Sequence, residues 1–173
     1  MDSVTLKKIA YDKLAINLDE MLKHYRQLLD LVRKEKDILI AANMNDLEDN
    51  NTHKEQLISK IKYLDSLRMN YASELAHLIG ADYEQPRLLE ISQKMGGVEG
   101  EKLRTMHSAL ELVINRLSAI NKENEIYANS ALQSVNSALN NFKDHLSGQK
   151  TYQNKGKYKQ GPDTSGHLVK REA

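Results

Sequence analysis

Residues 103–146 read LRTMHSALELVINRLSAINKENEIYANSALQSVNSALNNFKDHL, a run that contains neither Gly nor Pro. The first apolar residues of this run follow the alternating steps of three and four that keep side chains on one face of a helix. These residues are Leu103, Met106, Leu110, Val113, Leu117 and Ile120. The pattern predicts one long helix with an apolar seam along its first half.

That seam reaches a polar residue, Asn124, and a second stripe follows on a rotated face. Steps of four at positions 120, 124, 128 and 132 form a local stutter, which turns the stripe around the helix axis. The second stripe, called the arm stripe below, consists of Leu132, Val135, Leu139, Phe142 and Leu146. We interpret the first seam as internal core. The arm stripe is either further core, a homodimer contact, or a docking face for a helix of another protein.

The N-terminal half carries two further helical seams, and the first Gly and Pro of the chain are Gly80 and Pro86. One seam consists of Leu14, Leu18, Met21, Tyr25, Leu28 and Val32 and continues through Glu35 to Leu39. The other consists of Leu57, Ile61, Leu64, Tyr71, Leu75 and Leu78. The short polar linker between them predicts an antiparallel hairpin, with a single uninterrupted helix as the alternative.

Local signals set the expected helix ends. Asn45 is a candidate N-cap with Glu48 in the capping-box position, and Gly80 stands where a left-handed residue closes a helix. Residues 80–100 form a crossover that contains a short helix over residues 87–91, with Pro86 at its first turn. The third long helix is expected from about residue 100 to about residue 147.

The predicted fold is therefore all-α: an elongated antiparallel helical hairpin plus a long third helix, in a coiled-coil-like three-helix bundle. The predicted domain spans residues 1–148. Residues 149–173 contain Gly, Pro and Lys and few aliphatic residues, so we expect a flexible, disordered basic tail. From Ser147 onward there are six basic residues and two acidic ones. A short, mildly basic terminus is more often solvated than bound to nucleic acid, so no nucleic-acid partner is expected.

Composition excludes several classes of function. The chain has no Cys, which removes disulfides and thiolate chemistry and fits a reducing compartment. No apolar run approaches the roughly 20 residues needed to cross a bilayer, and the N-terminus has no signal-peptide core. We expect a soluble, cytoplasmic protein without membrane insertion.

Catalytic and metal-binding motifs are missing from the sequence. There is no P-loop, no nucleophile elbow, no zinc-protease motif and no dinucleotide-binding turn. Glu74 and His77 form one E-x-x-H pair, whereas a di-iron bundle needs two such pairs and two further carboxylates. The sequence therefore predicts neither an enzyme nor a bound metal or cofactor.

The order of these features resembles the FlgN family of flagellar export chaperones. The matching pieces are residues 28–37 (LLDLVRKEKD), the turn at 42–48 (ANMNDLE), residues 54–57 (KEQL), residues 120–124 (INKEN) followed by Leu132, Val135 and Leu139, and residues 151–156 (TYQNKG). The resemblance covers most of residues 14–156. Each piece is common in coiled coils, and the specificity lies in their order and spacing.

The resemblance implies a cytoplasmic chaperone of a bacterial flagellar type III secretion system. It would bind the terminal helical segments of hook-associated (hook–filament junction) proteins, prevent premature assembly and deliver them to the export gate and its ATPase complex. By resemblance, the arm stripe is the client-binding face, and Tyr152 docks to the export gate. Tyr158 remains an alternative because the Lys- and Gly-rich end departs from the family pattern. A structural coiled-coil or self-associating scaffold is the competing hypothesis.

Overall fold

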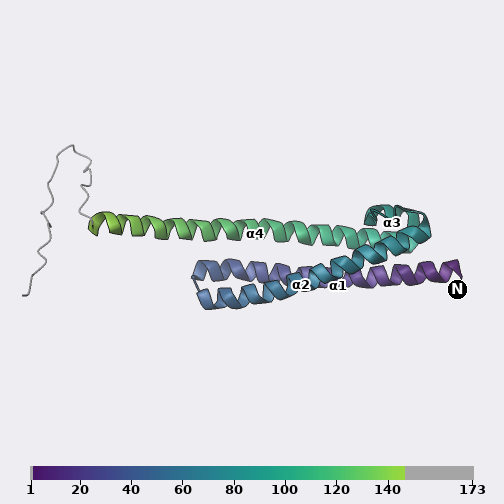
Figure 1. Cartoon of the computed structure of the whole chain (residues 1–173), viewed down its shortest axis with the longest axis horizontal. Helices are drawn as coiled ribbons and strands as arrows, with labels where there is room; N and C mark the ends of the chain where they lie inside the picture. Colours follow the sequence, from purple (N-terminus) through teal and green to yellow (C-terminus); the bar gives the residue numbers. More distant parts are fainter. Residues whose placement is uncertain (1, 147–173) are drawn as a thin grey trace, which may run out of the picture. The chain divides into compact units, whose positions relative to one another are not determined.

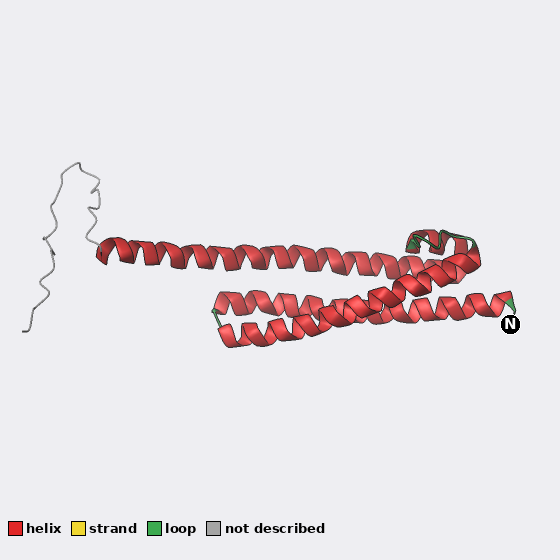
Figure 2. Cartoon of the chain, in the orientation of Figure 1, coloured by secondary structure: helices red, strands yellow, loops and turns green. Residues whose placement is uncertain are grey.

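The computed structural model describes residues 2–146, with side chains through residue 143. Four helices make up the regular structure of this range: α1 (Ser3–Ala41), α2 (Met44–Ile79), α3 (Leu88–Met95) and α4 (Gly97–Leu146). Figure 1 traces them along the chain, and Figure 2 shows helix throughout the described range, with short connections between helices. The predicted all-α fold is confirmed.

Helices α1 and α2 form the predicted hairpin and pack against each other, with α2 crossing α1 on its way from the hairpin turn to α3 (Figure 1). The chain reverses at Ala42, which adopts a left-handed conformation with φ 52° and closes α1 through bonds to the last carbonyls of that helix. Asn43 then caps α2, because its side-chain oxygen accepts from the backbone N–H of Asp46 at 3.3 Å. The alternative of one uninterrupted helix is therefore wrong.

The cap of α2 differs from the predicted one by two residues. Asn43 is the N-cap, whereas Asn45 lies inside the first turn of the helix. The side-chain amide of Asn43 also donates to the Asp46 carboxylate at 2.7 Å, which holds the cap from both sides. Either Asn can cap a helix, and the left-handed Ala42 just before Asn43 determined which of them does so.

The crossover after α2 depends on glycine conformations. Gly80 closes α2 with φ 70°, as predicted, and its carbonyl accepts from the Lys94 ammonium of α3. Gly96 and Gly97, both at positive φ, end α3 and start α4, so the third long helix begins three residues earlier than expected. Pro86 precedes the N-cap Arg87 and lies outside α3.

The core consists mainly of the three predicted seams. Leu14, Leu18, Leu75 and Leu103 are fully buried, and Met106, Leu117 and Ile120 pack against the same cluster. At 25 cal/mol per Å², burial of such a side chain contributes about 1.5–3 kcal/mol. The interpretation of the seams over residues 14–39, 57–78 and 103–120 as internal core is confirmed at these positions.

Three buried asparagines link the helices of this apolar core by hydrogen bonds. Each donates its side-chain N–H to a main-chain carbonyl of another helix: Asn17 to Leu64 at 3.2 Å, Asn50 to Leu31 at 3.2 Å, and Asn124 to Val32 at 2.8 Å. A polar group buried among apolar side chains costs stability unless its partner is in place. These bonds therefore fix the lengthwise register of the helices.

The chain divides into two compact units, Met1–Tyr127 and Ala128–Ala173. The first contains α1, α2, α3 and the beginning of α4. Of the second, residues 128–146 are described, and they are helical. The predicted tail, residues 149–173, lies outside the described range.

Candidate functional site

The first apolar seam of α4 ends in a polar cluster at Asn124. The Asn124 side chain is 4% exposed and donates both to the Val32 carbonyl and to Glu35 Oε2 at 3.0 Å. The other oxygen of Glu35 accepts from Lys54 Nζ at 2.6 Å. Residues from α1, α2 and α4 thus meet at one point, where the two polar interruptions noted in the sequence, Glu35 and Asn124, are hydrogen-bonded to each other.

A second set of contacts lies beside this cluster on the surface. Lys36 Nζ is 3.0 Å from Glu123 Oε2 and 5.6 Å from the centroid of the Tyr127 ring. The hydrogen bond with Glu123 raises the pKa of Lys36, because it stabilises the charged ammonium. The sequence did not single out these residues, since no helical periodicity relates positions separated by so much of the chain.

The arm stripe lies in the second unit. The exposed fractions of its described side chains are 59% for Leu132, 56% for Val135, 52% for Leu139 and 60% for Phe142. The fifth residue, Leu146, is the last residue of α4, and its side chain lies outside the description, as does all of Tyr152. Four large apolar side chains at helical spacing therefore form an exposed apolar face, the arrangement typical of a binding surface.

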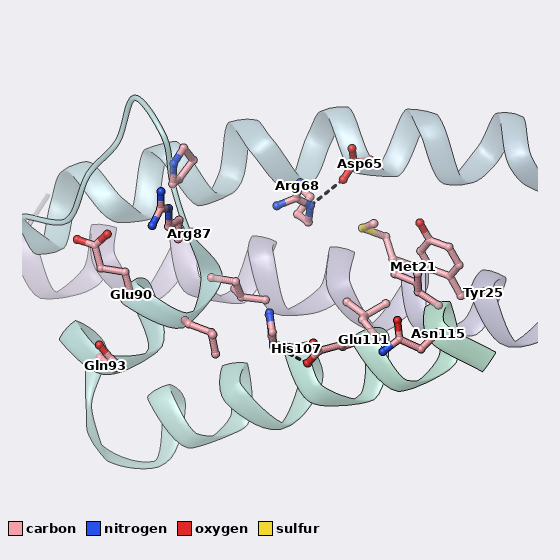
Figure 3. Close-up of a pocket in the computed structure, with 15 residues that line it drawn as sticks. Met21, Tyr25, Asp65, Arg68, Arg87, Glu90, Gln93, His107, Glu111 and Asn115 are labelled. Atoms are coloured by element: carbon pink, nitrogen blue, oxygen red, sulfur yellow. Dashed lines mark hydrogen bonds and ion pairs between the residues drawn. The ribbon is translucent and has the colours of Figure 1, made fainter. Parts of the chain in front are cut away.

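A groove of about 790 Å³ lies in the first unit, with walls from all four helices. Figure 3 shows Met21 and Tyr25 from α1 and Glu111 from α4 along it. Within its walls Arg68 pairs with Asp65 at 2.8 Å, and His107 lies 4.0 Å from Glu111 (Figure 3). Each of these pairs joins residues of one helix, and neither sets an acid and a base against an open reacting position. We assign the groove no chemistry.

Comparison with family models found one that spans nearly the whole chain: the model described as FlgN protein matches residues 1–160. The chain belongs to the FlgN family. The resemblance inferred from the order of the sequence motifs is thereby confirmed. Searches of curated proteins and of solved structures returned no match.

Membership of the FlgN family gives the general function, because this is a family of flagellar export chaperones and not of enzymes. The general partners of such a chaperone are flagellar export substrates.

The E-x-x-H pair has other contacts in this FlgN-family chain. Glu74 pairs with Lys13 of α1 at 3.2 Å, and the His77 ring packs edge-on against Tyr83, with centroids 5.3 Å apart. In the described part of the chain, no three His, Cys, Asp or Glu side chains gather as metal ligands would. Nor do residues 2–146 contain a helix of the length and apolarity that a membrane span requires.

Proposed function

We propose that this FlgN-family chaperone binds the terminal helical segments of hook–filament junction proteins on the arm stripe. Binding takes place in the cytoplasm and keeps these clients from assembling before export. The observation that carries the proposal is the exposure of Leu132, Val135, Leu139 and Phe142 on one face of a continuous helix. A client that polymerises through apolar helices needs a temporary partner of this kind.

The expected strength of binding follows from the size of the face. Burial of each of these side chains contributes about 1.5–3 kcal/mol, and part of the total is lost to the entropy of association. The remainder corresponds to a reversible complex in the micromolar to nanomolar range. Such a complex can form in the cytoplasm and release its client at the export machinery.

Delivery to the export gate is the second part of the proposal. Tyr152, which lies beyond the described residues, is the candidate contact with the gate, and Tyr158 is the alternative. A Tyr152→Ala variant should keep client binding and lose recruitment to the cytoplasmic part of the export gate. Tyr158→Ala is the matched variant. If only the latter loses recruitment, Tyr158 is the docking residue.

The arm stripe is tested with the double variant Leu139→Asp/Phe142→Asp. Its affinity for the terminal segment of a junction protein, measured by calorimetry, should fall by at least about 100-fold, because two apolar contacts are lost and two carboxylates are desolvated. Helicity and thermal stability should remain close to those of the parent, since both side chains are exposed.

The control is Ser137→Asp/Asn140→Asp, which adds the same charge on the opposite side of α4 and should bind normally. Retained binding by the Leu139→Asp/Phe142→Asp variant would refute the proposal. Loss of its helical fold or of a self-associated state would instead favour the structural scaffold.

A further inference from the structure

Four of the five residues of the arm stripe, all except Leu146, lie in the longest stretch of the chain that has no charged side chain. Residues 126–142 contain no Asp, Glu, Lys, Arg or His, although 28% of the whole chain is charged. At 1.5 Å per residue this segment is about 24 Å long. We call residues 126–142 the uncharged segment.

The first half of α4 has the opposite character. Charged side chains are spread through residues 97–125, and some are paired within the helix: Arg104 lies 3.6 Å from Glu101, and His107 lies 4.0 Å from Glu111. The same helix thus changes from a charged to an uncharged stretch of sequence where its apolar face changes from buried to exposed. Helix propensity does not require this change, because Glu, Lys and Arg are good helix formers.

Small side chains also occupy the g positions beside the arm stripe. In the seven-residue register in which Leu132 and Leu139 take position a and Val135 and Phe142 take position d, Ala131 and Ala138 take position g. Coiled coils commonly place charges at g and e, where they select partner and orientation. Here Ala at g widens the apolar face and allows close approach of another helix axis, and Asn136 supplies neutral hydrogen-bonding groups at e. The next e position is Lys143, so the neutral flanks lie along Leu132, Val135 and Leu139.

We propose that the arm stripe selects an amphipathic helix whose contact face and flanking positions are themselves uncharged. The inference rests on the proposed function and specifies the chemistry of its partner. A charged side chain at the flank of the partner would lose hydration against Ala and Asn without gaining an opposite charge. Along the uncharged segment, recognition is therefore by shape and apolar contact, without electrostatic attraction.

The test uses the full chain and three probes. Two are synthetic helical peptides with the same Leu/Val stripe; one has Ala, Ser, Asn and Gln at the flanks, and the other has Glu and Lys there. Both carry lysines only beyond their helical ends. The third is the terminal helical segment of a hook–filament junction protein. Affinities are measured by fluorescence anisotropy at 50 and 500 mM NaCl.

The peptide with neutral flanks should bind at least about tenfold more tightly than the charged one. Its dissociation constant, and that of the junction segment, should change by less than about twofold between the two salt concentrations, because no ion pair is screened. Equal binding of the two peptides, binding of neither, or a strong salt dependence would overturn the inference.

Two further variants each place one negative charge on the same helical turn, one beside the arm stripe and the other on the far face. Ala138→Glu puts a carboxylate beside the arm stripe and should weaken binding of the neutral peptide at least about tenfold. Ser137→Glu puts it on the far face and should change binding by less than about twofold. Equal effects of the two would count against recognition through neutral flanks.

The outcomes separate this inference from the proposed function. If the neutral peptide binds as expected and the junction segment does not, the uncharged face is correct and the assigned client is wrong. If the junction segment binds but both peptides bind equally well, the client is correct and the inference fails. Formation of a dimer that Leu139→Asp abolishes, seen by analytical ultracentrifugation, would make a second copy the occupant and would also overturn the inference.

Discussion

Asn124 is the residue where the scaffold part of α4 ends, and its surroundings explain why a polar side chain is buried there. Its amide donates to Val32 and Glu35, while its own oxygen has no hydrogen-bond partner among the described residues. The side chain is therefore held by its donor end alone. An apolar residue at this position would leave one oxygen of the buried Glu35 without this donor.

Replacing Asn124 by Ala tests that explanation. We expect Asn124→Ala to lower the free energy of unfolding by about 1–3 kcal/mol, because a buried acceptor on Glu35 loses its donor. Urea denaturation followed by circular dichroism measures the change. The control, Asn121→Ala on the exposed side of the same turn, should stay within about 0.5 kcal/mol of the parent. Similar effects of the two substitutions would contradict the role of the buried amide.

At the scale of elements, the connection from α3 to α4 depends on one close approach. A Cβ atom at Gly100 would overlap the main-chain carbonyl oxygen of Ser92, which belongs to the last turns of α3. Ser92 is itself 2% exposed and donates its hydroxyl to the Leu89 carbonyl at 2.7 Å. Because the obstructing atom is backbone, α3 or α4 must move to accommodate a side chain.

This close approach predicts an unusual result for a substitution of Gly by Ala inside a helix. Alanine normally stabilises a helix interior by about 1 kcal/mol relative to glycine. At position 100 we expect the reverse, a loss of about 1–3 kcal/mol from overpacking. Thermal unfolding of Gly100→Ala, with Lys102→Ala as the exposed control on the same helix, measures the difference. A stabilised Gly100→Ala variant would show that the two helices separate easily.

At the scale of the whole molecule, three titratable groups make the free energy of unfolding depend on pH in the alkaline range. Burial raises the pKa of Tyr11 and Tyr25 above 10.0, and the hydrogen bond with Glu123 raises that of Lys36 above 10.5. All three groups hold their protons more strongly in the folded chain than in the unfolded one. Their contribution to stability is therefore complete below the unfolded pKa values and declines as pH rises through the folded ones.

We accordingly expect the free energy of unfolding to fall between about pH 10 and pH 12. Urea denaturation at several pH values in this window measures the slope. The Tyr11→Phe/Tyr25→Phe variant removes two of the titrating groups, so its slope should be smaller than that of the parent. An identical slope in the variant would show that the two phenols do not contribute.

The helices, their core faces and the family could be predicted from the sequence, because helical periodicity depends on the local spacing of apolar residues. The apolar steps of α1, α2 and α4 identified the helices and their core faces, and Gly80 marked the end of α2. The stutter near Asn124 separated the two faces of α4. The order of motifs also gave the family, which the match over residues 1–160 established.

Other features were decided only by the tertiary structure, because they join residues far apart in the chain. The choice of Asn43 as the cap depended on the left-handed turn at Ala42, and the overlap at Gly100 depends on where α3 ends. The contact of Asn124 with Glu35 and that of Lys36 with Glu123 likewise exist only after packing. Periodicity identifies the face of a helix, but the partner across that face is set by three-dimensional register.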